Sequence, residues 1–278
     1  MAVRDVIKVG QIVIKLKNKA ENIRNSENQK SASKITKVEY KNSEMNISYS
    51  LIPYQRNQDV IKIQKNNRGA KLIVSVVDGY NDNNKLRDNK PGKNVATFVA
   101  TNFPKTFLKT QIKDVRKRAE ISAEIIDQEV IKIYPAYVAC VGGFLFSFES
   151  KQIIIVVGSI FVYIWNGFLW KKAKEIGDYS LDLKKYPSDV SRFFGEGELK
   201  RQNPTFYKAK PDTVILPYKT PVFIGTDGTE EILSLEDLNH VTKKTGLKSA
   251  KKLIDKLTDF IQSKKNLQND DASIFLKI

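Results

Sequence analysis

Residues 71–83, KLIVSVVDGYNDN, contain the stretch that decides the fold. The run 72–77 is apolar and rich in β-branched residues, which is typical of a strand buried in a core. Asp78 follows this run directly, and we expect the strand to end there. Gly79 then lets the backbone turn and come close to whatever the carboxylate binds. The stretch therefore predicts a carboxylate held at the end of a buried strand.

The same order of residues recurs downstream, in PVFIGTDGTEEIL at residues 221–233. Residues 222–226 predict a strand that leads into Asp227 and Gly228. Two acids that follow strands indicate two carboxylates converging on one site, which would suit a divalent cation. Asp-Gly is also among the commonest turn dipeptides, so two ordinary strand-to-loop turns explain the same residues. The spacing alone leaves both interpretations open.

The composition is that of a globular protein. The chain has 278 residues, of which 41% are hydrophobic, so it can bury a large core and is not of the disordered class. No repeat or convincing linker divides it. We therefore expect one domain over residues 1–278, with the polar segment 21–34 as a mobile loop.

The charge is strongly positive, since 47 Lys and Arg residues face 31 Asp and Glu residues, a net charge of +16. Such a surface favours anionic partners, which include phosphoproteins, nucleic acid and anionic membranes. The lysines are scattered, and aromatic residues do not alternate with them as in a nucleic-acid platform. A solvated basic surface is the simpler interpretation, and no specific nucleic-acid partner is predicted.

The single cysteine, Cys140, and the single histidine, His240, exclude several kinds of site. One cysteine cannot form an internal disulfide, and the two residues together cannot build a thiolate zinc site. We expect His240 on a helix, as a surface or packing residue. The first ten residues lack the apolar segment of a secretory signal. An intracellular, cytoplasmic location is predicted.

Residues 153–170, IIIVVGSIFVYIWNGFLW, are uncharged and long enough to suggest a membrane span. Asn166 and Gly167 within the run are typical of a hairpin turn, and the composition is β-branched and aromatic. We expect two strands of a buried sheet and no membrane span. Membrane association through this apolar hairpin stays an open alternative.

The order of expected elements indicates mixed α and β structure. Early strands are expected at 35–40 and 45–52, with a further strand pattern starting at Val60, and late ones at 214–217, 222–226 and the end of the chain. Helices are expected at 95–109, 112–130, from Ser234 and at 249–264. Between the two helix groups we expect strands at 137–141, 144–148, 152–157 and 160–165.

Four acids share one position, the boundary between a loop and an apolar strand: Asp59, Asp78, Asp227 and Asp270. Carboxylates without His or Cys are hard oxygen ligands, which suit Mg²⁺ or Mn²⁺. Two such ions side by side can activate a water for attack on a phosphoryl group.

The surroundings of these acids resemble a known family. RNQD at 56–59, VSVVDGYND at 74–82, FIGTDGTEEILSLEDL at 223–238 and NDDASIFLKI at 269–278 are similar, in this order, to motifs of the metal-dependent protein phosphatases of the 2C type, the PPM family. The resemblance covers residues 35–278. It implies a β-sandwich of two antiparallel sheets flanked by pairs of helices.

The resemblance also implies a phosphoprotein serine/threonine phosphatase with two Mn²⁺ or Mg²⁺ ions. Asp78 would bridge both ions, and the Gly79 carbonyl would bind the second. Asp227 and Asp270 would complete the first ion, and Asp59 would hold the second ion or its waters. The catalytic residues would be Asp78 and Asp59.

Three positions depart from the family pattern. Tyr80 stands where the family has a histidine, and Ser159 where it has an acid for a third metal ion. Tyr54 stands at the position of the arginine that binds the substrate phosphate, so Arg56 nearby is the expected ligand of that phosphate. These departures keep open a slow enzyme or a pseudophosphatase that acts as a binding or regulatory module. A nucleic-acid binder without catalysis rests on the charge alone.

Overall fold

The computed structural model describes residues 35–41, 45–54, 57–67, 69–81, 90–173, 192–202, 208–264, 266 and 270–278. All of them belong to one compact unit, Ile35–Ile278. The expected loop at 21–34 and Arg56 lie outside the described residues. A single domain over the whole of 1–278 therefore stays a prediction.

Two antiparallel sheets form the centre of this unit. One has the strand order β1-β2-β12-β11-β7-β8, and the other has the order β10-β6-β5-β4-β3, with β9 added beside β5. The strands of the first sheet are β1 (Thr36–Lys41), β2 (Asn46–Ile52), β12 (Ala272–Lys277), β11 (Val222–Gly225), β7 (Phe161–Trp165) and β8 (Trp170–Lys172). Those of the second are β10 (Asp212–Pro217), β6 (Lys151–Val157), β5 (Val138–Ser147), β4 (Ala70–Asn81), β3 (Val60–Asn67) and β9 (Phe194–Gly195).

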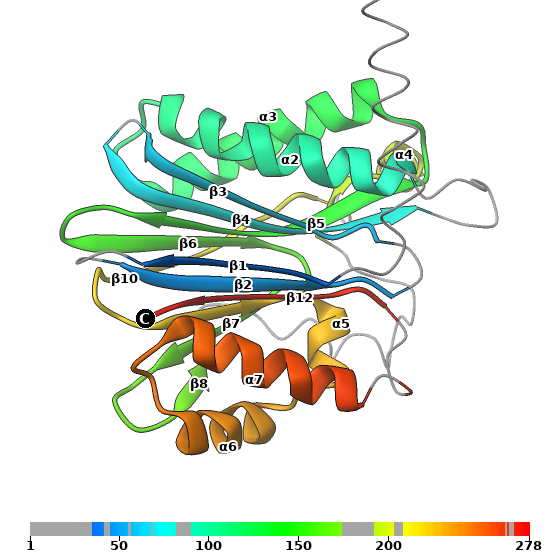
Figure 1. Ribbon diagram of the computed structural model, residues 1–278. Helices are drawn as coiled ribbons and strands as arrows, with labels where there is room; N and C mark the ends of the chain where they lie inside the picture. Colours follow the sequence, from blue (N-terminus) through cyan, green and yellow to red (C-terminus); the bar gives the residue numbers. More distant parts are fainter. Residues whose placement is uncertain are drawn as a thin grey trace, which may run out of the picture. The chain divides into compact units, whose positions relative to one another are not determined.

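A pair of helices covers the outer face of each sheet, so that four layers are stacked (Figure 1). The helices are α2 (Lys90–Lys109) and α3 (Val115–Ile133) on the second sheet, α6 (Leu235–Thr245) and α7 (Ala250–Ser263) on the first, and the short α4 (Gly197–Gln202) and α5 (Asp227–Glu230). The β-sandwich flanked by helix pairs that the family resemblance implied is confirmed.

The alternation of side chains along β4 explains why two sheets and two helix layers form. Leu72 and Val74 face the other sheet, whereas Ile73 and Val77 pack against α2 and α3. All of these side chains are fully buried. A strand with both faces covered needs a nearly continuous apolar run, and residues 72–77 supply it. The one polar residue, Ser75, is buried, and its hydroxyl donates to the Ala100 carbonyl of α2 at 2.9 Å. A third core joins α6 and α7 to the outer face of the first sheet.

Three of the expected helices start directly after an N-capping residue. α6 starts after Ser234, as predicted, and Ser234 forms a capping box with Asp237. Asp114 and Ser249 accept backbone hydrogen bonds at the starts of α3 and α7. The four expected helices are therefore confirmed, although α2 begins five residues earlier than the apolar spacing indicated.

The break that the sequence predicted between two strands at residues 141–144 does not exist. Residues 137–148 predicted two strands, but β5 runs unbroken through Gly142 and Gly143. A Cβ atom at Gly142 would overlap the ring of Phe144, and one at Gly143 would overlap Ile160. These glycines allow close packing inside the sandwich, and they do not make a turn.

The uncharged run 153–170 forms strands, as predicted, but these belong to both sheets. Its first part lies in β6, and the next lies in β7, which pairs with β11 of the other sheet. Gly158, with φ +88°, lies where the chain crosses between the sheets. In the part of the chain that the structure describes, no helix is long and apolar enough to cross a membrane.

Candidate active site

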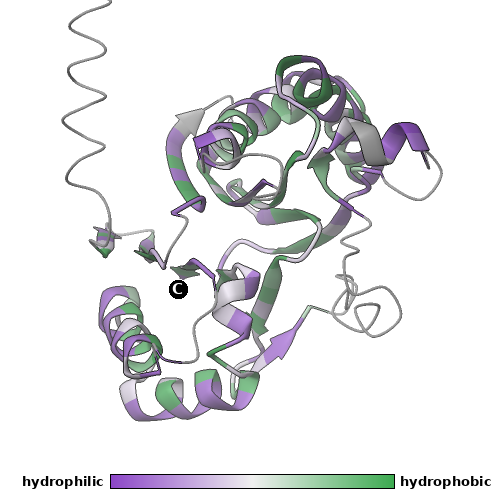
Figure 2. Ribbon diagram, turned by 90° about the vertical axis from the view of Figure 1, so that its right-hand side faces the viewer, coloured by the Kyte–Doolittle hydropathy of each residue, from purple (hydrophilic) through white to green (hydrophobic). Residues whose placement is uncertain are grey.

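The predicted acids lie at one end of the sandwich, and both sheets contribute to them. Asp59 immediately precedes β3 and Asp78 lies in β4, both in the second sheet. Asp227 begins α5 just after β11, and Asp270 immediately precedes Asp271 and β12, both in the first sheet. Figure 2 looks onto this end, with the helix pairs on either side of the strand ends.

The two Asp-Gly corners are not the turns that the sequence indicated. Asp78 lies within β4, opposite Val141 of β5, and the strand continues to Asn81. A Cβ atom at Gly79 would overlap the carbonyl oxygen of Gly92 in α2. Gly79 is therefore needed because the first turn of α2 packs directly on the backbone of β4.

Gly228 has the same role in the other sheet. A Cβ atom there would overlap the carbonyl oxygen of Asp271. Asp227 starts a short helix rather than a loop, and its Oδ1 accepts a hydrogen bond of 2.8 Å from the Gly228 backbone. The absence of a side chain at Gly228 brings Asp227 beside the residues that lead into β12.

Asp78 lies among three other carboxyl groups. Burial raises its pKa well above the usual range, and repulsion from Asp227, Asp59 and Asp270 raises it further. A hydrogen bond with Asp227 acts in the same direction. Asp59, Asp227 and Asp270 are thus close enough to Asp78 to affect its ionisation. Negative charge on this group of acids is costly without a compensating cation.

Asp59 is 4% exposed and is held by a residue that the sequence did not single out. The hydroxyl of Thr226 donates to Asp59 Oδ2 at 3.0 Å and accepts from the backbone of Ser273 at 3.0 Å. Burial, followed by repulsion from Asp271, raises the pKa of Asp59 well above its usual range, although Ser273 and Asp78 lower it. Thr226 therefore joins the acids of the two sheets.

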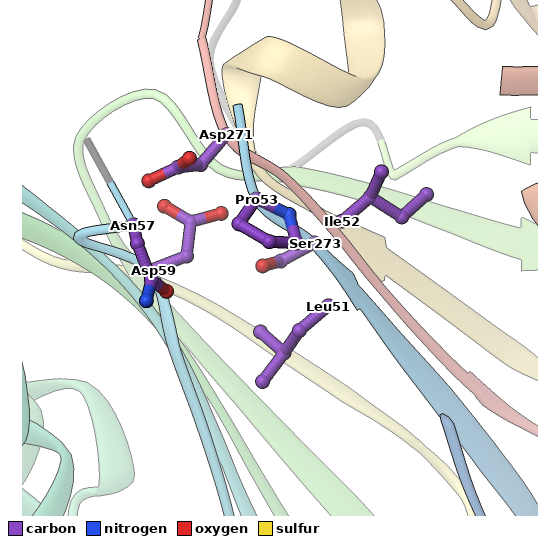
Figure 3. Close-up of a pocket in the computed structure, with 7 residues that line it drawn as sticks. All are labelled: Leu51, Ile52, Pro53, Asn57, Asp59, Asp271 and Ser273. Atoms are coloured by element: carbon purple, nitrogen blue, oxygen red, sulfur yellow. The ribbon is translucent and has the colours of Figure 1, made fainter. Parts of the chain in front are cut away.

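Asp271 is a second residue that the sequence did not single out. Its carboxylate accepts the backbone N–H of Tyr54 at 2.7 Å and that of Gln58 at 2.5 Å. Figure 3 shows its carboxylate facing that of Asp59 across a small pocket. The pocket is lined by Leu51, Ile52, Pro53, Asn57, Asp59, Asp271 and Ser273. Asp271 fixes the backbone that carries the first acidic motif.

Lys93, in the first turn of α2, places a cation beside these acids. Its ammonium group donates to Asn57 Oδ1 at 3.0 Å and to the backbone oxygen of Asp59 at 3.1 Å. Burial lowers the pKa of Lys93, while Asp59 and Asp271 raise it. Nothing in the local sequence indicates this role, because it depends on the packing of α2 on β4.

The positions that depart from the family pattern have different surroundings. Tyr80 is 45% exposed and follows the acid-bearing part of β4. Ser159 is half-buried in the crossing between β6 and β7. Arg56, the predicted phosphate ligand, lies outside the described residues. His240 is exposed on α6, in agreement with a surface role.

The acids fit a divalent cation by their chemistry. Every candidate donor is an oxygen atom. Asp59 Oδ1 is buried and has no hydrogen-bond donor within the described ranges, although Ser273 and Asp78 are near. Among the described residues, no three His, Cys, Asp or Glu side chains are arranged as a preformed metal site. A bound ion would thus have to draw these carboxylates together.

Solved structures share this architecture. A serine/threonine phosphatase from S. agalactiae matches with a TM-score of 0.60 and 17% identity, over 84% of this chain and 98% of that chain. The fold is that of 2C-type phosphatases. The serine/threonine phosphatase Stp1 from Staphylococcus aureus matches with a TM-score of 0.58 and 11% identity, over 89% and 95% of the two chains.

The phosphatase fold is also shared by PppA, a regulatory component of the T6SS in Pseudomonas aeruginosa. This match has a TM-score of 0.56 and 12% identity, over 88% of this chain and 97% of that chain. No protein-family model and no curated protein sequence matches the chain. The likeness to the phosphatase fold therefore lies in the structure, and it extends over nearly the full length of these three chains.

Proposed function

We propose that this protein is a metal-dependent phosphatase of the PPM family that hydrolyses phosphoserine and phosphothreonine in proteins. The observation that carries the proposal is the position of Asp78, whose carboxyl group interacts with Asp59, Asp227 and Asp270. Those acids come from both sheets of a phosphatase fold. A fold of this kind does not need mutually repelling carboxylates for its stability, since removing them from water together is costly.

Two Mn²⁺ or Mg²⁺ ions fit this donor set. Asp78, Asp227 and Asp270 would hold one ion, and Asp78, Asp59 and the Gly79 carbonyl would hold the other. Divalent ions bound in this way supply Lewis-acid chemistry for the attack of water on a phosphate ester. The basic surface of the chain, with a net charge of +16, would attract phosphorylated substrates.

The neighbouring residues position the acids. Thr226 orients Asp59 by donating to Oδ2, and Lys93 binds the backbone of the same residue. Asp271 holds residues 54 and 58 through two backbone N–H groups. These contacts fix the first acidic motif before a substrate or an ion binds, which reduces the reorganisation that catalysis would require.

Hydrolysis of a phosphoserine peptide in the presence of Mn²⁺ tests the proposal. We expect turnover that depends on Mn²⁺ or Mg²⁺ and stops with a chelator. Asp78→Asn should reduce turnover to the level without enzyme, whereas Asp259→Asn, which changes an exposed acid on α7, should act like the wild type. A phosphotyrosine peptide tests the preference for serine and threonine.

Two results would oppose this function in different ways. If Mn²⁺ binds but no phosphopeptide is hydrolysed, the protein is a binding module with a phosphatase fold. If Asp78→Asn hydrolyses the peptide as fast as the wild type, the acids at this end of the sandwich are not the active site.

A further inference from the structure

The turn between β7 and β8 presents an apolar tip, residues 166–169, to solvent. Phe168 is 85% exposed, the largest value among the exposed large hydrophobic residues of the described chain, and Leu169 is 50% exposed. Full exposure of a phenylalanine is unfavourable in water, so a side chain held in this way is a candidate contact for another apolar surface.

The apolar tip is rigidly built. Asn166 Oδ1 accepts the backbone N–H groups of Phe168 and Leu169 at 3.0 and 2.9 Å, and Gly167 adopts φ +103°. The Asn166 backbone N–H also donates to the Leu169 carbonyl at 3.1 Å. Since the turn is already ordered, little backbone entropy would be lost when Phe168 and Leu169 become buried against another apolar surface.

The base of the tip is anchored to α6. Trp170 is 1% exposed, and its ring packs edge to face on Trp165 at 5.5 Å. The backbone N–H of Trp170 donates to Asn239 and its indole N–H donates to Thr242, at 2.7 and 2.9 Å. These contacts place the end of α6, with its lysines, close to the tip.

The two segments that build this region are basic. Residues 161–173 and 238–249 contain no acidic residue. Their lysines are Lys171, Lys172, Lys243, Lys244 and Lys248. Lys172 lies over the ring of Phe161 at the other end of β7, whereas Lys171 follows the tip directly, and Lys243 and Lys244 follow Thr242, which binds Trp170. These three lysines are exposed. An apolar tip with exposed lysines beside it is complementary to a surface with an apolar interior and a negative face.

The tip also points away from the acids of the proposed active site. Phe161, at the start of β7, pairs with Gly225, two residues before Asp227, and Ile164 pairs with Val222 at the other end of β11. Figure 1 accordingly shows α5 and the β7–β8 turn at opposite ends of the sandwich. Contact through the tip would leave the acidic end open to solvent.

We propose that this tip binds anionic lipid bilayers, with Phe168 and Leu169 inserted between the headgroups and the lysines against acidic lipids. Two side chains on a convex turn offer much less area than the roughly 1,200 Å² that a specific protein interface buries. A bilayer requires only an insertion of about 5–10 Å. Each lysine near an anionic leaflet strengthens binding by about fivefold.

Sedimentation of the full chain with vesicles tests the proposal. We expect binding to vesicles that contain phosphatidylserine, weaker binding to phosphatidylcholine alone, and release by salt. Phe168→Ser combined with Leu169→Ser should lower the partition coefficient at least about tenfold. Lys171→Glu combined with Lys243→Glu should abolish the preference for phosphatidylserine. All variants should melt at the temperature of the wild type, which verifies the fold without reference to catalysis.

Ile133→Ser is the matched control, because Ile133 is 57% exposed at the end of α3, away from the tip. It should bind vesicles like the wild type. The proposal is overturned if the wild type does not sediment with phosphatidylserine vesicles, which would leave the tip to a protein partner. It is also overturned if the Phe168 and Leu169 variant sediments as well as Ile133→Ser.

Discussion

Several charged side chains of this protein are buried, and Lys277 in β12 is the clearest case outside the proposed active site. It is 2% exposed, and its ammonium group donates to the Tyr218 carbonyl at 2.5 Å and lies 4.7 Å from the Tyr218 ring centre. Burial lowers its pKa from 10.5 to about 8. The hydrogen bond therefore offsets only part of the cost of removing the charge from water.

The pKa of Lys277 predicts a rise in stability with pH. Above about pH 8 the folded protein loses this proton, while the unfolded chain keeps it up to about pH 10.5. The unfolded state then binds more protons, so the free energy of unfolding increases between these values, by at most about 1.4 kcal/mol per pH unit. Urea unfolding between pH 7 and 10 should show a steeper rise in the wild type than in Lys277→Met. Equal pH profiles would contradict the assignment.

At Asp78 we expect stability and function to oppose each other. Burial and three neighbouring carboxyl groups raise its pKa, so its ionised form is unfavourable in the folded state at pH 7. In metal-free buffer, Asp78→Asn should increase the free energy of unfolding by about 0.5–2 kcal/mol. Chemical unfolding with a chelator present measures this, and Asp259→Asn should be nearly neutral. A destabilised Asp78→Asn protein would show that the carboxylate is compensated by the fold itself.

Among the elements, α4 is held against α3 by a buried ion pair. Lys200 Nζ lies 2.5 Å from Asp127 Oδ1 and donates to the Phe193 carbonyl at 2.8 Å. Asp127 also accepts the Gly195 backbone N–H at 2.9 Å. Burial nevertheless raises the pKa of Asp127 and lowers that of Lys200, against the attraction between them. The pair thus positions β9 and α4 more than it stabilises the protein.

Breaking this pair from one side should cost more than replacing both partners. Asp127→Leu leaves a buried ammonium group without its carboxylate, and we expect a loss of about 3–5 kcal/mol. Asp127→Leu combined with Lys200→Met should recover most of that loss, since no charge remains buried. A double-mutant cycle by urea unfolding measures the coupling. Additive losses from the two single changes would mean that the pair does not act as a unit.

For the whole unit, the division of the acids between the sheets links metal binding to folding. Asp59 and Asp78 lie before β3 and within β4 of one sheet, whereas Asp227 and Asp270 lie next to β11 and β12 of the other. Only the packed sandwich brings all four carboxylates to the same two metal ions. A metal ion that binds them therefore binds the folded state and not the unfolded chain, which stabilises the fold.

Mn²⁺ should therefore raise the melting temperature. At a hundred times its dissociation constant, a bound ion adds about 2.7 kcal/mol, which corresponds to roughly 5 °C for a domain of this size. Calorimetry with and without Mn²⁺ measures the shift, and Asp227→Asn should remove most of it. An unchanged melting temperature in the wild type, or the same rise in the variant, would oppose a metal site shared by the sheets.

Local sequence was sufficient for most of the elements. The apolar run 72–77 predicted a buried strand, and Ser234 and Ser249 marked the starts of two helices, because periodicity and capping depend on neighbours a few residues away. The four acids could also be selected, since each stands beside an apolar strand. That they bind metal ions stays a prediction.

Only the tertiary structure decided how these parts meet. It divided residues 153–170 between the two sheets, continued β4 beyond Asp78, and showed that Gly79 and Gly228 allow close backbone packing. Asp271 holds Tyr54, 217 positions earlier in the chain, and Lys93 reaches Asn57 from a separate helix. Contacts over such separations depend on sheet register and layer packing, and no local pattern of residues encodes either.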